Sequence, residues 1–381
     1  MAHSPLEAQP HAAGSLSPVL GDAQLARAAS RAELDAWEEL DRFQGPGERR
    51  ATLLALLMTP GSRSELEAWR EACAEVGRAG RALELVASLS APARPAALER
   101  VLHDSRRAPA AERLELLRTS RTLMCADGKV GPLDRLRWLY ARQCLAEQEP
   151  GIGGRPSGLA AWAEEPVADA DRAGAHALPE ALKQPTGRLT SYLARMVPMA
   201  DPQSKVGSLG VAWHRAVMSG LWGDELPPCR LPDSDQLVQA LTEVQELSWM
   251  QRPLLARLWV EAAFALMQRR QSGRTDPGPL ATPSGAAWTS TAPARLDSAP
   301  VSLPMPDGGA SAPESDPAPA AGADSVPEQG RATATASAAE PAWPPHWPDL
   351  DALCALRLAC RMIDTPLPPP LARAFVEHPQ G

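Results

Sequence analysis

The sequence predicts an all-α protein with two helical subdomains, built from antiparallel helical hairpins and interrupted by a long disordered insert. Three observations favour this fold class. Apolar residues recur at helical spacing along most of the chain. Long alternating runs of β-branched residues, which are typical of strands, are absent. One long stretch after residue 270 is rich in Pro, Ala and Ser. The length of 381 residues allows two domains.

The N-terminal part is predicted to be a tail followed by a helical domain. Residues 1–25 are rich in Ala, Pro, Ser and His, which favours a disordered tail without the basic start and apolar core of a signal peptide. Residues 26–148 form the predicted N-terminal helical domain. Ser64 and Glu67 have the spacing of a capping box. The first helices of this domain are predicted over residues 51–58, 64–76, 82–89 and 96–103.

The stretch 112–145 is predicted to be a helical hairpin that bends at an acidic turn. Gly128 suits a backbone position with positive φ just after a helix, and Pro132 suits the first turn of the next helix. Apolar spacing predicts which residues of the two helices face inward. Those before the turn are Leu116, Leu117, Ser120, Leu123 and Met124, and those after it are Leu133, Leu136, Tyr140 and Cys144.

The second half is predicted to be helical on both sides of the insert. Residues 149–185 are predicted to be a linker, and residues 186–270 a second helical domain. The insert covers residues 271–345, which hold three basic and eight acidic residues and too little apolar surface to offset the entropy of ordering. Residues 346–375 are predicted to supply the closing helix of the second domain.

Composition narrows the function classes. The formal net charge is −8, which argues against a general nucleic-acid binder because such proteins need a basic surface. No apolar run is long enough to span a membrane. The six cysteines show no CxxC spacing, which favours free thiols in a reducing compartment and a cytoplasmic location. No HExxH, GxSxG or phosphate-binding glycine motif occurs, so the chain is not expected to be an enzyme.

The hairpin resembles a known family. Residues 123–130 read Leu-Met-Cys-Ala-Asp-Gly-Lys-Val, and with Asp134 they resemble the signature of TerB-like, or tellurite-resistance-type, helical domains. The chain also resembles the cytosolic C-terminal region of bacterial membrane zinc metallopeptidases of the HtpX and CAAX-protease type, which end in an Asp-x-Pro-Leu-Pro-Pro segment like residues 364–369 here. The departures are the missing HExxH motif and the missing peptidase domain. The insert also replaces the acidic turn that the family pattern implies in the second half.

Asp127 and Asp134 are the candidate metal ligands. Hard divalent cations prefer oxygen ligands, and two carboxylates on either side of a tight turn could converge on one ion. The resemblance to TerB-like domains, which are associated with metal binding, implies the same. The alternative is that Asp127 binds turn amides and Asp134 caps the following helix. A divalent cation is the one cofactor considered, and no other is expected.

The hairpin is also locally basic. Between Arg106 and Arg142 there are nine basic and four acidic residues. This surface could dock an anionic partner, a membrane surface or the acidic insert, or it could be an ordinary solvated helix face. The candidate binding residues are Arg118, Arg121, Arg135 and Arg137.

Taken together, the sequence favours a non-enzymatic, cytosolic interaction or regulatory module. It would bind a protein partner and no nucleic acid. Peripheral contact with a membrane surface and a link to envelope or metal stress are further expectations. The alternative is a divergent metal-binding protein, or an accessory subunit of a membrane metallopeptidase.

Overall fold

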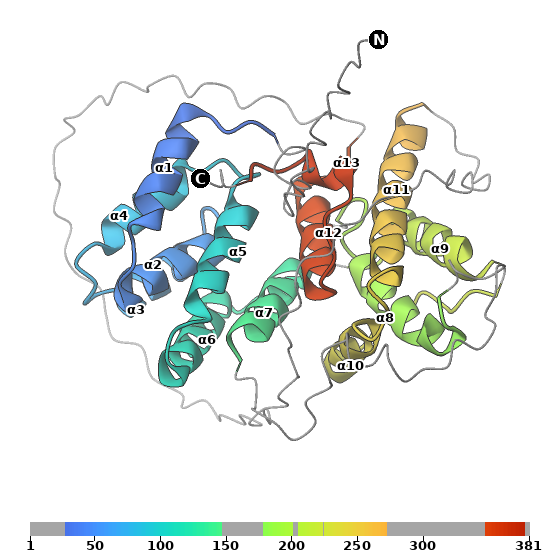
Figure 1. Cartoon of the computed structure of the whole chain (residues 1–381), viewed down its shortest axis with the longest axis horizontal. Coiled ribbons are helices and arrows are strands. Elements are labelled where there is room, and N and C mark those ends of the chain that lie inside the picture. The colour runs from blue at the N-terminus through green and yellow to red at the C-terminus, as the bar shows by residue number, and fades with distance from the viewer. Residues whose placement is uncertain (1–26, 147–177, 201–204, 224, 273–346, 378–381) are drawn as a thin grey trace, which may run out of the picture.

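All the regular secondary structure in the described part of the chain is helical. A computed structural model describes residues 27–146, 178–200, 205–223, 225–272 and 347–377 (Figure 1). No strand occurs within these ranges, which confirms the predicted all-α class. The predicted tail, nearly all of the predicted insert and most of the predicted linker lie outside the described residues.

The first half contains seven helices among its described residues, arranged around α2. Figure 1 labels α1 (Arg31–Asp41), α2 (Pro46–Leu57), α3 (Arg63–Ala72), α4 (Ala79–Ser88), α5 (Arg94–Ser105), α6 (Ala110–Met124) and α7 (Pro132–Leu145). Every residue of α2 from Ala51 to Leu57 is buried. A helix that is apolar on all sides must be enclosed, and α2 packs against α4, α5 and α6.

The start of α3 corrects one prediction. The capping box predicted at Ser64 and Glu67 is wrong, because the helix begins two residues earlier than that pattern implies. Gly61 turns the chain with a φ of 86°, and Ser62 then takes the N-cap position, where its hydroxyl accepts a hydrogen bond from the Glu65 N–H at 3.4 Å. A glycine with positive φ ends the preceding turn, so the next residue is the first that can cap.

The second half forms a second helical group. Its helices are the short 3₁₀ turn Glu180–Leu182, α8 (Lys183–Leu193), α9 (Ser208–Trp222), α10 (Ser234–Val244), α11 (Gln251–Gln271), α12 (Leu350–Met362) and α13 (Pro369–Ala372). Helix α8 begins at Lys183, which lies inside the range predicted as linker. Trp213 and Trp259 are fully buried at the centre of this group.

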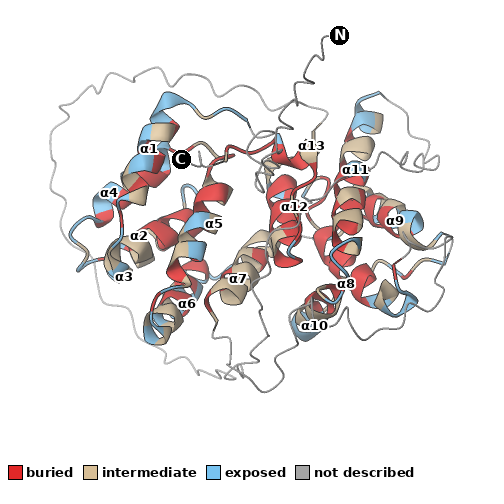
Figure 2. Ribbon diagram, viewed as in Figure 1, coloured by how far each residue is buried: buried red, intermediate tan, exposed pale blue. Residues whose placement is uncertain are grey.

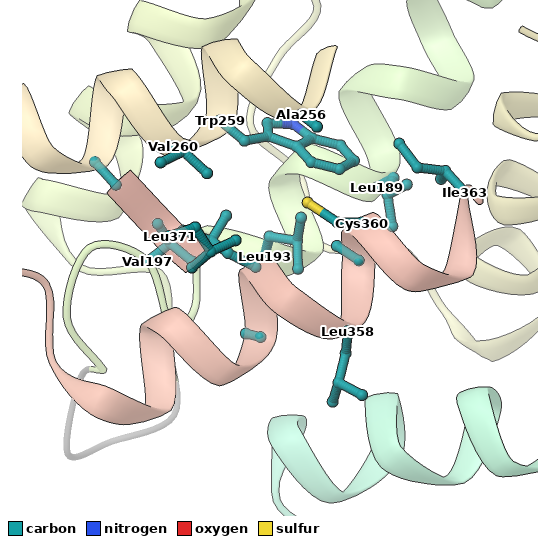
Figure 3. Close-up of a cluster of buried hydrophobic side chains, with 14 of the residues drawn as sticks. Leu189, Leu193, Val197, Ala256, Trp259, Val260, Leu358, Cys360, Ile363 and Leu371 are labelled. Atoms are coloured by element: carbon teal, nitrogen blue, oxygen red, sulfur yellow. The ribbon is translucent and has the colours of Figure 1, made fainter. Parts of the chain in front are cut away.

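Helix α12 lies between the two halves. It packs against α7 on one side and α11 on the other, and every residue from Ala352 to Cys360 is buried (Figure 2). In Figure 3, Cys360 of α12 lies beside Trp259 of α11, whereas Leu358 points to the opposite side of α12. This helix therefore contributes apolar surface to contacts with both helical groups.

The C-terminal residues tie the halves together. Phe375 belongs to the apolar cluster of the second half, and its neighbour Val376 belongs to that of the first half. The Val376 N–H donates to the Pro92 carbonyl at 3.3 Å, and the Phe375 carbonyl accepts from the Arg27 N–H at 2.8 Å. The segment that follows α13 thus crosses from one group to the other.

The two helices that flank the predicted insert, α11 and α12, pack against each other. The rings of Phe264 on α11 and Trp347 before α12 meet edge to face, with centroids 5.4 Å apart. The chain therefore leaves α11 and returns to a helix that neighbours it.

Candidate functional site

The predicted acidic turn between α6 and α7 is present and exposed. Gly128 has a φ of 72°, and its N–H donates to the Cys125 carbonyl at 3.0 Å. The Asp127 carboxylate accepts a hydrogen bond from the Lys129 N–H at 2.8 Å. Asp127 therefore stabilises the turn in the way an Asx turn does, with its side chain bonded to the backbone two residues on.

Asp134 is engaged by its own helix. One carboxylate oxygen accepts a hydrogen bond from the Gly131 N–H at 3.1 Å, and the other accepts from the Arg137 guanidinium at 3.1 Å. The carboxylate also lies in the first turn of α7, where the helix dipole favours negative charge. Both oxygens thus have local partners.

The two aspartates are not accompanied by further ligands within the described ranges. No group of three or more His, Cys, Asp or Glu side chains is placed there to hold a metal ion. A protein site for a hard cation usually supplies more oxygen ligands than two carboxylates. The divalent-cation site at Asp127 and Asp134 therefore stays a prediction.

We expect Asp134→Ala to lower the free energy of unfolding by about 1 kcal/mol, because Gly131 N–H loses its partner at the start of α7. Asp127→Ala should cost less, since Asp127 is exposed and water can replace its single bond. Urea unfolding of both variants measures the difference. An equal or larger loss for Asp127→Ala would contradict the capping role of Asp134.

The four candidate binding arginines fall into two pairs. Arg118 and Arg121 are exposed on the outer face of α6. Arg135 instead donates to the Ser234 hydroxyl at the start of α10, and Arg137 pairs with Asp134. Arg135 and Arg137 therefore bond other parts of the protein, whereas Arg118 and Arg121 are exposed to solvent.

Arg118 has one weak acidic neighbour. The Arg118 side chain is 77% exposed, and its closest acidic group is Glu115 at 3.9 Å. Lys129, in the turn that follows α6, is also exposed. We name Arg118, Arg121 and Lys129 the α6 basic face. Long cationic side chains with solvent around them remain available to an incoming anion.

A buried charge cluster escaped the sequence analysis. The Arg357 side chain on α12 is 0% exposed, and it donates to both oxygens of Glu99 on α5 at 2.6 and 2.7 Å. Glu377 pairs with the same guanidinium, and Arg361 donates to Glu99 at 3.1 Å. The Phe375 ring lies 4.7 Å from the Arg357 carbon Cζ. We name Glu99, Arg357, Arg361 and Glu377 the α5–α12 charge cluster.

The titration of groups in and around this cluster follows from burial. Burial alone would raise the pKa of Glu99, but the charges and hydrogen bonds of Arg357 and Arg361 outweigh it and lower that pKa. Burial raises the pKa of the Tyr140 phenol well above its usual value, and that of the Cys144 thiol to about 11. Both therefore stay protonated at neutral pH, and Cys144 is not a nucleophilic thiolate.

A small cavity lies between α1, α2 and α5. Its volume is about 30 Å³, and its lining includes Trp37, Phe43 and Arg100. This volume holds a water molecule and is far below that of a typical ligand pocket. The cavity is therefore not a candidate substrate site.

Comparison of the chain with protein-family models, curated proteins and solved structures returns no match. Within the described ranges, no helix combines the length and apolar character that a bilayer crossing requires.

Proposed function

We propose that the chain is a non-enzymatic, cytosolic interaction and regulatory module that binds an acidic protein partner through the α6 basic face. The observation that carries the proposal is the exposure of Arg118 and Arg121, three residues apart on α6, and of Lys129 in the turn that follows that helix. The whole chain has a net charge of −8, so exposed cations on one helix and its following turn make the charge distribution uneven. Complementary charge steers encounter and selects partners.

The chemistry of this face favours a protein over the other polyanions. Nucleic-acid binders release counterions from many phosphates and therefore carry extended basic surfaces. Two exposed acids, Glu115 and Asp127, belong to the same helix and turn as the three cations of the α6 basic face, which leaves a small net charge. At about 1 kcal/mol per cation near an anionic membrane, that charge gives weak membrane binding. A protein partner can place its carboxylates opposite the cations and avoid the two acids.

The resemblance of the hairpin to TerB-like domains belongs to the same proposal. It implies a helical module that works alongside other proteins, and in this chain the peptidase motif of the related metallopeptidases is missing. The carboxylates of Asp127 and Asp134 accept hydrogen bonds from backbone N–H groups of the acidic turn. A role in binding a partner uses the hairpin surface without requiring a metal.

The test is a charge reversal on α6. We expect the double variant Arg118→Glu, Arg121→Glu to lose at least about tenfold in affinity for a short fluorescein-labelled glutamate peptide, measured by anisotropy. Binding by the native chain should also weaken as salt is raised, since exposed charges are screened. Unchanged circular dichroism and melting temperature would show that the fold is intact.

The matched control is Arg215→Glu with Arg230→Glu, which makes the same change in net charge on exposed residues of the second half. This variant should bind the peptide as the native chain does. Equal losses in both double variants would mean that only net charge matters, and would overturn the proposal. So would an absence of binding by the native chain.

A further inference from the structure

His214 is a buried titratable residue in the contact between α8 and α9. It lies on α9, and its side chain is 2% exposed. The Nε2 atom of the ring is buried and has no hydrogen-bond partner among the described residues. The ring also interacts with the backbone of Gly187 on α8. A buried polar atom without a partner is uncommon in folded proteins and calls for a specific explanation.

The backbone around His214 is packed too closely to admit water. A Cβ at Gly187 would lie 2.8 Å from the Cγ atom of Pro227, in the segment after α9. A Cβ at Gly210, one helical turn before His214, would lie 2.0 Å from the carbonyl oxygen of Ala194 at the end of α8. Contacts this close change between discrete arrangements and do not loosen gradually. Water therefore reaches the His214 ring only when α9 separates from α8.

The elements around His214 offer no buried carboxylate among their described residues. Helices α8 and α9 contain no acidic residue. The described acids on α11 and in the segment after α9 are all exposed, and they are Glu225, Asp233 and Glu261. Glu225 pairs with Lys183. Glu261 pairs with Arg257. The buried or half-buried ionisable side chains there are Lys183, Arg188 and Tyr192 on α8, Arg195 after it, Cys229 after α9, and Arg252, Arg257 and Arg269 on α11. A positive charge on His214 thus has no buried carboxylate to stabilise it.

The protonation of His214 is linked to the separation of the two helices. Burial lowers the pKa of the His214 imidazole, and the smaller opposite effect of the Gly187 backbone does not cancel it. An exposed imidazole has a pKa of about 6.5. The open form therefore takes up a proton at a higher pH than the closed form does. By linkage, the closed form is fully favoured above about pH 6.5 and loses stability as the pH falls below that value.

We propose that the contact between α8 and α9 is a pH-sensitive switch, in which protonation of His214 releases α9 from the second half at mildly acidic pH. Helix α9 packs mainly against α8 and α11, and it lies towards the edge of the second half in Figure 1. Its release uncovers an apolar face that includes Trp213 and Val217. The switch lies outside the α6 basic face and does not depend on the proposed function.

Hydrogen exchange of the full chain, measured by mass spectrometry, tests the switch. Peptides that cover α9 are compared in dilute solution at about pH 7.5 and about pH 5.5, after correction for the intrinsic exchange rate. We expect the opening constant of α9 to rise by about three- to tenfold at the lower pH. Tenfold is about the limit for one proton taken up by a group whose exposed pKa is about 6.5. The opening constant of α2, in the first half, should stay the same.

Two histidine variants assign the effect. His214→Gln keeps a polar side chain that cannot take up a proton, so the opening constant of α9 should no longer change with pH. His214→Asn makes the same test if the glutamine variant does not fold. The matched control is His103→Gln, which replaces an exposed histidine on α5 and should respond to pH as the native chain does.

Three results would overturn the switch. The first is an α9 opening constant that is equal at the two pH values in the native chain. The second is a response like that of the native chain in His214→Gln or His214→Asn. The third is an equal rise in the opening constants of α2 and α9, because the whole chain would then lose stability in acid. A loss of peptide binding by the α6 basic face would overturn the proposed function and leave the switch standing.

Discussion

Replacing Arg357 by methionine is expected to lower the free energy of unfolding by about 3 to 5 kcal/mol, because it leaves buried carboxylates without their main partner. Arg357 donates to both oxygens of Glu99 and pairs with Glu377. Arg361 alone would then face Glu99. Methionine fills much of the arginine volume, so the loss reports the charges more than a cavity.

Urea unfolding measures this loss, and Arg373→Met is the control. Arg373 follows α13 directly and is exposed, so its replacement should change the free energy of unfolding by no more than about 0.5 kcal/mol. Adding Glu99→Gln and Glu377→Gln to Arg357→Met should restore part of the stability, since the carboxylates no longer carry buried charge. A loss in Arg357→Met no larger than that in Arg373→Met would show that the α5–α12 charge cluster does not hold α12 in place.

The helices were predictable because their signal is local. The residues predicted to face inward before the turn are the residues that α6 buries, which are Leu116, Leu117, Ser120, Leu123 and Met124. The face predicted for α7 is less accurate. Leu136 is buried as expected, but Tyr140 is half-buried, and Ala141 and Leu145 are buried instead. Helix α7 meets apolar clusters on both sides, so a one-sided pattern underestimates its contacts.

The α5–α12 charge cluster could not be predicted from local sequence patterns. Glu99 and Arg357 are 258 positions apart, and no periodicity relates them. Within α12 an isolated arginine among leucines and alanines has the pattern of a solvent-facing residue, although Arg357 is wholly buried. The spacing of Arg357 and Arg361 by four residues was the one available hint, since it places both on one side of the helix toward a shared anion.

The candidate site likewise has features that local sequence rules predict and features that depend on tertiary packing. The local bonds of Asp127 and Asp134 follow from turn and capping rules, and both were among the alternatives that the sequence left open. The separation of the four arginines did not follow from sequence. Arg135 reaches Ser234 on α10, an element 99 positions away, so its role depends on how the two halves pack. The exposure of Arg118 and Arg121 does follow from the local pattern, because neither residue is on the predicted inward face of α6.

Gly210→Ala is expected to lower the free energy of unfolding by about 3 kcal/mol, although alanine is ordinarily the better helix former. A Cβ at this position on α9 would lie 2.0 Å from the carbonyl oxygen of Ala194, the C-cap residue of α8. A backbone oxygen cannot rotate away as a side chain can. The two helices would have to separate, and the buried Trp213 on α9 would lose contacts with the core.

The control for this substitution has the opposite expected sign. Gly80 lies in α4, and a Cβ there would meet nothing within 4 Å. Gly80→Ala should therefore raise the stability by about 0.5 to 1 kcal/mol, because it reduces the entropy of the unfolded chain. In thermal and urea unfolding, the midpoint of Gly210→Ala should fall below that of the native chain, and the midpoint of Gly80→Ala should rise above it. A stabilising Gly210→Ala would mean that α9 can move away from the end of α8 at little cost, and that the close approach is not what sets the packing of the second half.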